Sequence, residues 1–432
     1  MKNLLSNDYF KITNGDMIIS LNSLAKRSIE NKQNVINATV GMLFDEDNQL
    51  VCFDLIKNII QNLDYSKFLS YGSVNGGENF ESSLYNWLFV NVDFKNNYYA
   101  IIPSMGATGA IYLSLRNYCS KNQEVIISSI RWTNYDSIIK QLGLELKEFN
   151  FLSSDDEFDI DSFISCVNDS CKKHHRAYII INDPCQNPTG YTLSKDEWIE
   201  ILRFLNDKSI DYPIILLVDI AYIDFSKSSY DEIFSIMNDF LSENLMIQFT
   251  FSVSKSLSIY GLRGGALIGM SNSKDDIIEF KKVCEDTSRA TWALPNHLTC
   301  KIIEQALLTK DNQEGLRKEI ESAKQILRKR SEVFLQECEL INLVVYPYDD
   351  GFFILVPCVN PLEVCNKLIL KNIYVVPMCG GLRISLASIT LKQIKRLVKE
   401  IKAAIKDWGF IFYWCIKNNN NGILILHNPS IL

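Results

Sequence analysis

A lysine near the middle of the chain has neighbours that suit it to nucleophilic chemistry. Lys255 follows an apolar run, lies among small hydroxyl residues in segment 252–256 (SVSKS), and precedes Arg263 by eight positions. A lysine that is partly desolvated beside a cation has a lowered pKa, which leaves its amine neutral and nucleophilic. Most lysines are solvated surface groups, so it is the position of Lys255 that predicts this chemistry.

Two further polar segments also follow apolar runs. Asp219 ends a run of aliphatic residues and is followed closely by Tyr222, and segment 182–190 (NDPCQNPTG) lies between another run and a helix start. A lone aspartate at a strand end is more often a cap than a catalytic group, and Asn, Pro and Gly form tight turns in any protein. The position of both segments after apolar runs makes them candidates for a ligand site.

A segment of small residues, 104–110 (SMGATGA), follows an apolar run and opens an apolar helix. Small residues let the backbone approach a ligand, and the free N–H groups and dipole of a helix N-terminus attract phosphate. The alternative is an ordinary turn between a strand and a helix. The segment therefore predicts a phosphate site only in combination with the others.

The elements that must position these residues alternate between short apolar runs and helix-like stretches. Ser194 and Glu197 have the spacing of a capping box at the start of one such helix. Strands that alternate with helices predict an α/β fold with a mostly parallel sheet, which binds ligands at the carboxyl ends of its strands. The runs that we predict to be buried strands are 98–102, 125–129, 177–182, 214–219, 246–251 and 266–270.

The chain is long enough for two or three domains. We expect a large domain over residues 49–313, with a mostly parallel sheet flanked by helices. A smaller α+β domain would comprise residues 314–408 and the N-terminal segment 1–48, with an amphipathic helix over 314–340 joining the two. Residues 409–432 form a tail with apolar pieces too short to cross a membrane. We interpret it as packing on its own domain or a partner subunit, with a membrane-surface segment as the alternative.

Composition and charge argue against several kinds of partner. The 432 residues are 47% hydrophobic and 22% charged, with a net charge of −7. Because no Lys/Arg stripe stands out, we expect neither nucleic acid nor a membrane as a partner. The twelve cysteines are scattered without a C-x-x-C pair and no secretory signal is evident, so we expect reduced thiols in a cytoplasmic protein. His174 and His175 have no partners at ligand spacing, so no metal is expected.

Together and in this order, these segments resemble the fold-type I pyridoxal-phosphate-dependent aminotransferases, in particular class I, the aspartate and aromatic amino acid aminotransferases. The resemblance runs from about residue 36 to 404, and the Asn-Pro-Thr-Gly, Asp-x-Ala-Tyr and Ser-x-Ser-Lys…Arg-Gly-Gly motifs carry it. It implies that pyridoxal 5′-phosphate is the cofactor, and that Lys255 holds it as a Schiff base and moves the proton in catalysis. Asp219 would pair with the pyridine nitrogen. Asn187 and Tyr222 would bind the 3-oxygen of the ring.

The resemblance also implies the residues around the cofactor and substrate. Trp132 would stack on the ring, the alternative being an ordinary core tryptophan. Arg383 would bind the α-carboxylate of the substrate, with Gly41 on the same side. Arg289 would bind a distal carboxylate from across a dimer, the alternative being a solvated arginine at a helix end, and Tyr71 would reach the neighbouring subunit's site. The 5′-phosphate would lie on Gly106, Ala107, Thr108, Ser252, Ser254 and Arg263.

The implied reaction is amino-group exchange between an aspartate-like or aromatic amino acid and 2-oxoglutarate by a ping-pong mechanism. It would take place in a homodimer with shared active sites. A carbon–sulfur lyase or a decarboxylase with the same cofactor is the alternative, because a fold does not fix the reaction. A non-enzymatic regulator would need a DNA-binding module, for which the N-terminal segment has little room. The resemblance also suggests a cis peptide bond between Asn187 and Pro188.

Overall fold

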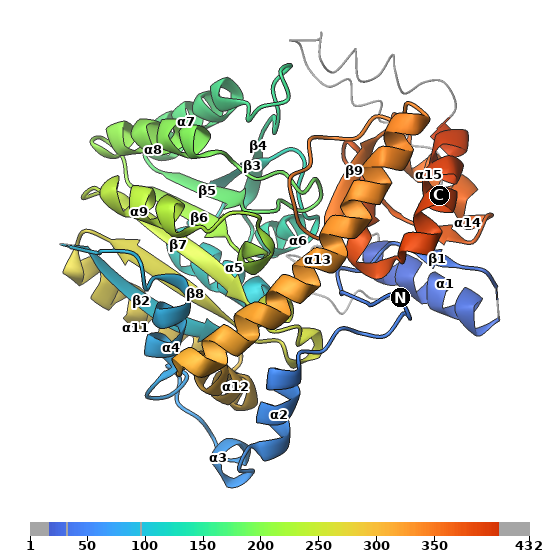
Figure 1. Cartoon of the computed structure of the whole chain (residues 1–432). Helices are drawn as coiled ribbons and strands as arrows, with labels where there is room; N and C mark the ends of the chain where they lie inside the picture. The colour runs from blue at the N-terminus through green and yellow to red at the C-terminus, as the bar shows by residue number, and fades with distance from the viewer. Residues whose placement is uncertain (1–16, 32, 96, 406–432) are drawn as a thin grey trace, which may run out of the picture.

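The computed structural model describes residues 17–31, 33–95 and 97–405. Its central sheet has seven strands in the order β2-β8-β7-β6-β5-β3-β4 (Figure 1). Five of them, β3 to β7, run parallel, whereas β8 is antiparallel to both of its neighbours. The strands are β2 (Tyr98–Ser104), β3 (Glu124–Ser128), β4 (Glu145–Phe149), β5 (Ala177–Asn182), β6 (Ile214–Asp219), β7 (Leu245–Ser252) and β8 (Gly265–Ser271).

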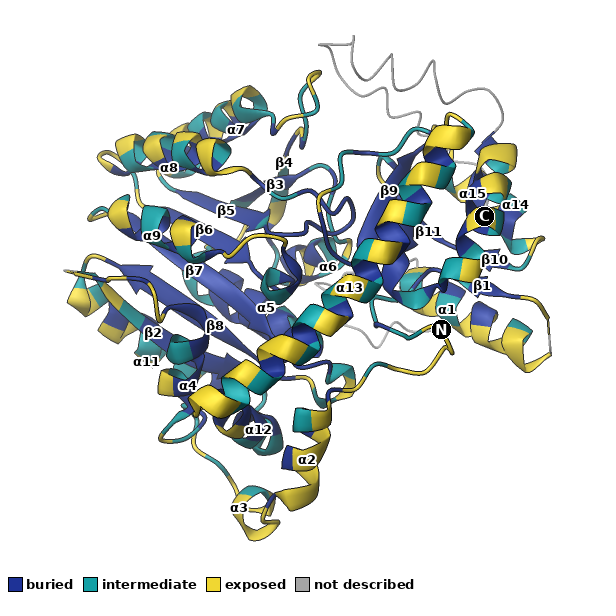
Figure 2. Ribbon diagram, viewed as in Figure 1, coloured by how far each residue is buried: buried dark blue, intermediate teal, exposed yellow. Residues whose placement is uncertain are grey.

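Helices cover both faces of this sheet, which explains why its central strands are apolar along their length. The strands β6 and β7 are buried at every residue, as the dark blue arrows in Figure 2 show. Alternate side chains of a strand point to opposite faces. In β5, Ile179 and Ile181 therefore enter one core, and Tyr178 and Ile180 enter the other. The first core includes α7 (Ile160–His174), α8 (Lys195–Ser209) and α9 (Asp231–Asp239), and the second includes α5 (Gly106–Tyr118), α6 (Asn134–Gln141) and α11 (Lys274–Thr291).

A smaller group of strands lies beside the long helix α13 (Lys310–Leu340), which crosses the molecule diagonally in Figure 1. Three of these strands form an antiparallel sheet in the order β11-β12-β9, while β1, from the N-terminal part, pairs in parallel with β10. The N-terminal segment thus packs with the last elements of the described chain. These elements are α1 (Met17–Glu30), β1 (Ile36–Asn37), β9 (Phe353–Pro357), α14 (Pro361–Ile369), β10 (Ile373–Tyr374), β11 (Val376–Met378), β12 (Gly381–Ser385), η3 (Leu386–Ser388) and α15 (Leu391–Ile405).

Shorter helices complete the structure around the large sheet. A group of four packs near its β2 edge and the first half of α13, at the lower end of the molecule in Figure 1. Three further short helices follow β6 and β7 and lie at the strand ends. All seven are α2 (Asp54–Asn62), α3 (Ser66–Leu69), α4 (Phe80–Leu88), α12 (His297–Leu307), η1 (Ile223–Phe225), α10 (Val253–Ser256) and η2 (Tyr260–Leu262).

One buried arginine of α13 joins three distant parts of the chain. Arg330 is 0% exposed, and its guanidinium donates hydrogen bonds of 2.8 Å to the Glu46 carboxylate and the Phe44 carbonyl oxygen. It also donates to the carbonyl oxygens of Leu386 and Ala387, both at 3.1 Å. The N-terminal loop, the long helix and the turn after β12 therefore meet on a single side chain.

The structure confirms the α/β class and all six predicted strands, to within two residues at each end. It also confirms the capping box, in which Ser194 Oγ accepts from the N–H of Glu197 and the Glu197 carboxylate accepts from the N–H of Ser194. The predicted helix over 314–340 begins four residues earlier, at Lys310. The domain boundaries stay a prediction.

Two features differ from what the sequence suggested. The strand β4 was not predicted, because it pairs only with β3 at the edge of the sheet and its side chains are mostly polar and partly exposed. The cis peptide bond lies between Asp183 and Pro184, so the expectation of a cis bond before Pro188 was wrong.

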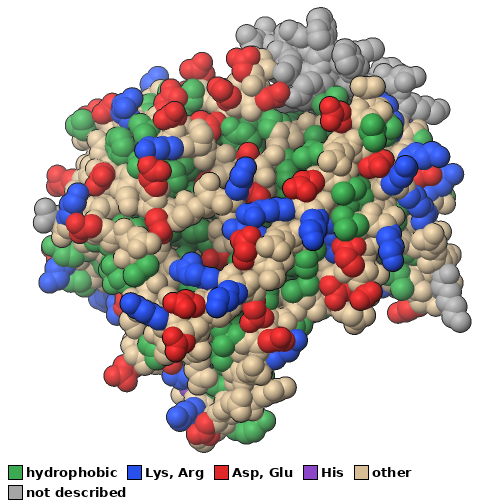
Figure 3. All heavy atoms as spheres, viewed as in Figure 1, with side chains coloured by type: hydrophobic (Ala, Val, Ile, Leu, Met, Phe, Trp, Pro, Cys, Tyr) green, Lys and Arg blue, Asp and Glu red, His purple; other side chains and the backbone are tan. Residues whose placement is uncertain are grey.

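The surface shows no single-sign charge field on the face drawn in Figure 3, where Lys and Arg side chains are interspersed with Asp and Glu. Within the described ranges, no helix is both long and apolar enough to span a bilayer. The tail 409–432, which the sequence analysis interprets as packing on its own domain or on a partner subunit, lies outside the described residues.

Candidate active site

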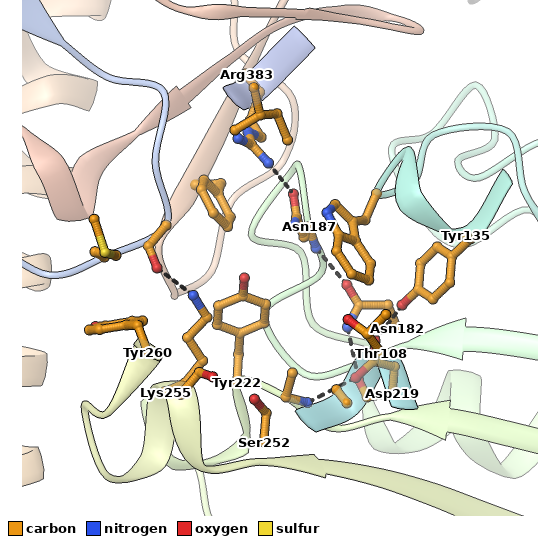
Figure 4. A pocket seen from close by; sticks show the side chains of 18 of the residues that line it. Thr108, Tyr135, Asn182, Asn187, Asp219, Tyr222, Ser252, Lys255, Tyr260 and Arg383 are labelled. Atoms are coloured by element: carbon orange, nitrogen blue, oxygen red, sulfur yellow. Dashed lines mark hydrogen bonds between the residues drawn. The ribbon is translucent and has the colours of Figure 1, made fainter. Parts of the chain in front are cut away.

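A cavity of about 250 Å³ lies at the carboxyl ends of β5, β6 and β7. Its walls come from the large sheet, from β9 and β12 of the small sheet, and from the N-terminal segment, as Figure 4 shows. Twelve of the residues assigned from the sequence line it: Gly41, Ala107, Thr108, Trp132, Asn187, Asp219, Tyr222, Ser252, Ser254, Lys255, Arg263 and Arg383. The edge of the sheet thus brings together motifs that are up to 342 positions apart.

Lys255 lies on the short helix α10 directly after β7, and its amine points into the cavity. Its Nζ donates a hydrogen bond to the carbonyl oxygen of Gly41. The same Nζ lies 5.4 Å from the ring centroid of Tyr222 and 5.0 Å from that of Tyr260. Desolvation, followed by repulsion from the Arg383 and Arg263 guanidinium groups, lowers the pKa of Lys255 to about 7. A large fraction of the amine is therefore neutral and nucleophilic near neutral pH.

Asp219 ends β6 with a buried carboxylate that three groups hold. Its Oδ1 accepts from the Thr250 hydroxyl at 2.7 Å and from the N–H of Ala221 at 3.2 Å, and its Oδ2 accepts from the Tyr135 hydroxyl at 2.5 Å. Burial raises the pKa of Asp219, and the three donors oppose that shift. The arrangement presents a fixed carboxylate to a cationic partner in the cavity.

The other end of the cavity is rich in donors. The helix α5 begins at Gly106, so the N–H groups of its first turn, including those of Ala107 and Thr108, have no partner within the helix. Arg263 lies above this turn, and its Nη1 donates to Ser254 Oγ at 3.2 Å. Gly106 has φ +70°, and a Cβ at this position would lie 2.9 Å from Arg263 Nη2. A cation, hydroxyl groups and a helix N-terminus together form a donor set that suits a phosphate group.

Arg383 enters the cavity from β12 of the small sheet and is 2% exposed. Its Nη1 donates to Asn187 Oδ1 at 3.2 Å, and its Nη2 donates to the carbonyl oxygen of Thr39 at 2.6 Å. The guanidinium carbon lies 4.3 Å from the ring centroid of Phe353. Asn187 is itself held by a hydrogen bond of 2.8 Å from its N–H to Asn182 Oδ1. These contacts fix a guanidinium group that can bind a carboxylate.

Three assigned residues do not line this cavity. Gly106 lies beneath Arg263, as described above, and supports the wall without reaching its surface. Tyr71 is 96% exposed, and Arg289 is exposed near the C-terminal end of α11. A role for these last two requires a second chain.

Seven lining residues were not assigned to the site from the sequence. Tyr135 lies on α6, three positions after Trp132, and the two rings meet edge-on with their centroids 5.4 Å apart. Its position close to the assigned Trp132 could have indicated from the sequence that Tyr135 lines the site. Ile18 and Met42 reach the cavity only because the N-terminal segment packs against the C-terminal sheet. The seven are Ile18, Met42, Tyr135, Asn182, Ala221, Tyr260 and Phe353.

The mixed seven-stranded sheet carries a lysine and a buried carboxylate at its strand ends, and Arg263 from the same domain and Arg383 from the small sheet line the same cavity. The chain belongs to the aminotransferase class I and II family, whose model matches residues 33–401. In the part of the chain that the structure describes, no three His, Cys, Asp or Glu side chains gather in a way that could hold a metal ion.

Known proteins are similar to the chain at low sequence identity. An aromatic-amino-acid aminotransferase from Pseudomonas aeruginosa is 22% identical over 226 residues, which are 50% of this chain and 55% of that protein. A crystal structure of an aminotransferase from Anaerococcus prevotii has a TM-score of 0.89 and 28% identity, covering 94% of this chain and 100% of that one. An aromatic-amino-acid aminotransferase from Burkholderia pseudomallei, covalently bound to pyridoxal phosphate, has a TM-score of 0.76 and 19% identity, with the same coverage. The match to the Pseudomonas aeruginosa protein thus spans little more than half of that protein's length.

Proposed function

We propose that the chain is a pyridoxal-phosphate-dependent aminotransferase. It would exchange an amino group between an aspartate-like or aromatic amino acid and 2-oxoglutarate by a ping-pong mechanism. One observation carries the proposal: the amine of Lys255, the carboxylate of Asp219 and the guanidinium group of Arg383 face one cavity. An amine, an acidic group and an anchor for an α-carboxylate are the groups that amino-group transfer on this cofactor requires.

The donor-rich end of the cavity fits the phosphate of pyridoxal 5′-phosphate. The Gly106 position supports this fit, because a side chain there would displace the cation that neutralises a phosphate. The phosphate would be held by the helix N-terminus at Ala107 and Thr108 and by Ser252, Ser254 and Arg263.

The middle of the cavity fits the cofactor's ring. Asp219 would accept a hydrogen bond from the protonated ring nitrogen, which keeps that proton in place. Asn187 and Tyr222 would donate to the 3-oxygen of the ring, and Trp132 would stack on its face. All four side chains line the cavity.

The residues of the chain then divide the chemistry between them. When bound, pyridoxal phosphate supplies an aldehyde that reacts with amines and a ring that withdraws electrons. Lys255 presents a neutral amine to that aldehyde, because its pKa is lowered to about 7. Once the substrate amine has released it, the same amine would take the proton from the substrate Cα and deliver it to the C4′ carbon of the cofactor. Gly41 orients this amine through its carbonyl oxygen.

The cavity wall bears on the substrate class. Arg383 would bind the α-carboxylate that every amino acid carries. Ile18, Met42 and Phe353 give the cavity an apolar wall, which supports an aromatic substrate side chain. Arg289 lies outside the cavity of its own chain, so a distal carboxylate would have to be bound by the copy of Arg289 in a second subunit.

An exposed apolar segment supports the homodimer. Three side chains around α3 are strongly exposed: Tyr65 at 68%, Leu69 at 76% and Tyr71 at 96%. This segment lies at the lower tip of the molecule in Figure 1. An apolar patch of this kind is typical of an interface, and we propose that a second copy of the chain covers it, with Tyr71 reaching the partner's cavity.

The experiment that tests the proposal is a visible absorbance spectrum of the purified protein with pyridoxal phosphate. The spectrum is recorded before and after glutamate, aspartate and tyrosine are added separately. We expect a band from the covalently held cofactor that bleaches as the amino group is transferred. We expect no such band for Lys255→Ala, so turnover by that variant without added amine would contradict the assignment. A band that persists with all three amino acids, together with pyruvate and ammonia released from cysteine conjugates, would favour the lyase.

The substrate class is tested by comparing aspartate with tyrosine as amino donors. If Arg289 binds a distal carboxylate, Arg289→Ala lowers kcat/KM for aspartate and leaves that for tyrosine unchanged. Equal values for the variant and the wild type with both donors would leave the apolar wall as the determinant, and an aromatic amino acid as the substrate.

A further inference from the structure

Tyr135 contacts the acidic group of the site although none of the sequence motifs assigned it a role. It lies on the first turn of α6, is 1% exposed, and its hydroxyl donates to Asp219 Oδ2 at 2.5 Å. Figure 4 shows this bond at the far end of the cavity from Lys255. A tyrosine buried in this way requires a partner for its hydroxyl, and the partner here is the carboxylate that faces the cavity.

The hydrogen bonds divide unevenly between the two carboxylate oxygens. Oδ1 accepts from both the Thr250 hydroxyl and the N–H of Ala221, which uses its two lone pairs. Oδ2 accepts only from Tyr135 among the described residues. One lone pair of Oδ2 is therefore left for a ligand in the cavity, and Tyr135 shares that oxygen with the ligand.

The hydroxyl of Tyr135 can act only as a donor in this pair. Burial and the neighbouring Asp219 charge raise the pKa of Tyr135 well above its ordinary value, so the hydroxyl keeps its proton. Its ring is fixed by the core beneath α6 and by the edge-on contact with Trp132, at 5.4 Å between centroids. The donor is thus held in place by packing on both sides.

We propose that Tyr135 is a positioning residue that keeps Asp219 ionised, so that the proton of an N–H–carboxylate pair stays on the cofactor's ring nitrogen. A hydrogen bond donated to the charged form of a carboxylate makes it a weaker base. Without that bond, the buried carboxylate would compete with the ring nitrogen for the proton, and a ring without the proton withdraws fewer electrons. The inference rests on the proposed function, because it presupposes pyridoxal phosphate in the cavity.

The test uses Tyr135→Phe, which removes the hydroxyl and keeps the ring. The protein is loaded with pyridoxal phosphate labelled with ¹⁵N in its ring, and the nitrogen chemical shift is measured by NMR. We expect a protonated nitrogen in the wild type and a shift toward the unprotonated value in Tyr135→Phe. Tyr178→Phe is the matched control: Tyr178 is also fully buried, bonds to Ser114 and packs in the same core, but it does not contact Asp219. Its nitrogen shift should equal that of the wild type.

Two further readouts separate positioning from a general structural effect. We expect the dissociation constant of the cofactor to rise about tenfold in Tyr135→Phe, as for the loss of one hydrogen bond to a charged group. We expect kcat to fall while KM for the amino acid is unchanged, because the change leaves Arg383 in place. An unchanged nitrogen shift in Tyr135→Phe would overturn the inference and leave the proposed function intact. A wild type that holds no covalent cofactor would overturn both.

Discussion

The guanidinium group of Arg383 donates a hydrogen bond of 3.2 Å to the side-chain oxygen of Asn187, a residue 196 positions earlier in the chain. This buried contact joins β12 of the small sheet to the loop after β5 of the large sheet. The group proposed to bind the substrate's α-carboxylate therefore also orients the amide proposed to bind the ring. A change at either residue is expected to affect both tasks.

We predict that Arg383→Lys raises KM for every amino acid substrate. A lysine carries the charge but cannot form two parallel hydrogen bonds to a carboxylate, which costs about 2 kcal/mol and lowers kcat/KM roughly 30-fold. Steady-state kinetics with glutamate, aspartate and tyrosine checks this prediction. A change with only one of the three would contradict the proposed role, since all share the α-carboxylate.

We predict that the cofactor-free protein takes up pyridoxal phosphate with a rate that increases as the pH rises through about 7. The pKa of Lys255 is lowered, so the unreactive ammonium form predominates below that pH and the neutral amine above it. The charged groups that face this amine are Arg383 and Arg263, and the phenols of Tyr222 and Tyr260 stay neutral there because their pKa values are raised. The initial rate of band formation is measured against pH, with a simple alkylamine as control. A midpoint near that of the free amine, about 10.4, would contradict the prediction.

We predict that Arg330→Met destabilises the fold by about 3 kcal/mol. The variant leaves the carbonyl oxygens of Phe44 and Leu386 without a donor among the described residues, whereas the Ala387 carbonyl oxygen keeps the N–H of Phe44. Unsatisfied groups that are buried or partly buried are costly, and the Glu46 carboxylate also loses its cation. Urea unfolding followed by circular dichroism gives the loss of stability. The control is Lys367→Met, which breaks an exposed pair and is expected to cost less than about 1 kcal/mol. Equal losses in the two variants would show that Arg330 contributes no more than a surface ion pair.

We predict that the protein has twice the 49.5 kDa mass of the chain by light scattering. Tyr71→Ala should retain that mass if other residues hold the interface, and should lower the affinity for the cofactor if Tyr71 enters the partner's cavity. A fully active species with the mass of one chain would refute the shared active site.

Much of the fold followed from local patterns in the sequence. Strands buried on both faces are continuous apolar runs, so β5 and β6 were predicted to the residue. The direction of β8 could not be predicted, because its apolar run looks the same in a parallel and an antiparallel pair. The edge strand β4 has only one neighbouring strand and carries the charged residues Glu145, Lys147 and Glu148. It therefore lacks the continuous apolar run by which the buried strands were predicted.

The site residues likewise fall into those that a local sequence pattern reveals and those that only the fold brings together. Residues inside a local motif, such as Lys255 and Asp219, were assigned because their spacing from an apolar run is visible in the sequence. In the sequence, Tyr135 looks like an ordinary residue on the apolar face of a short helix. Only the fold brings its hydroxyl to a carboxylate 84 positions away. Ile18 and Met42 depend on packing between the two ends of the described chain, which no local pattern records.

The glycine at the start of α5 also limits how this chain can evolve. At Gly106 two constraints coincide, a positive φ of +70° and an arginine nitrogen 2.9 Å from where a Cβ would lie. A side chain there would strain the backbone and displace the guanidinium group of Arg263, so we expect substitutions of Gly106 to be selected against. Gly315, in the helix α13, has nothing within 4 Å of its virtual Cβ and is open to neutral replacement by alanine. The two glycines of this chain are therefore expected to differ strongly in their tolerance of substitution.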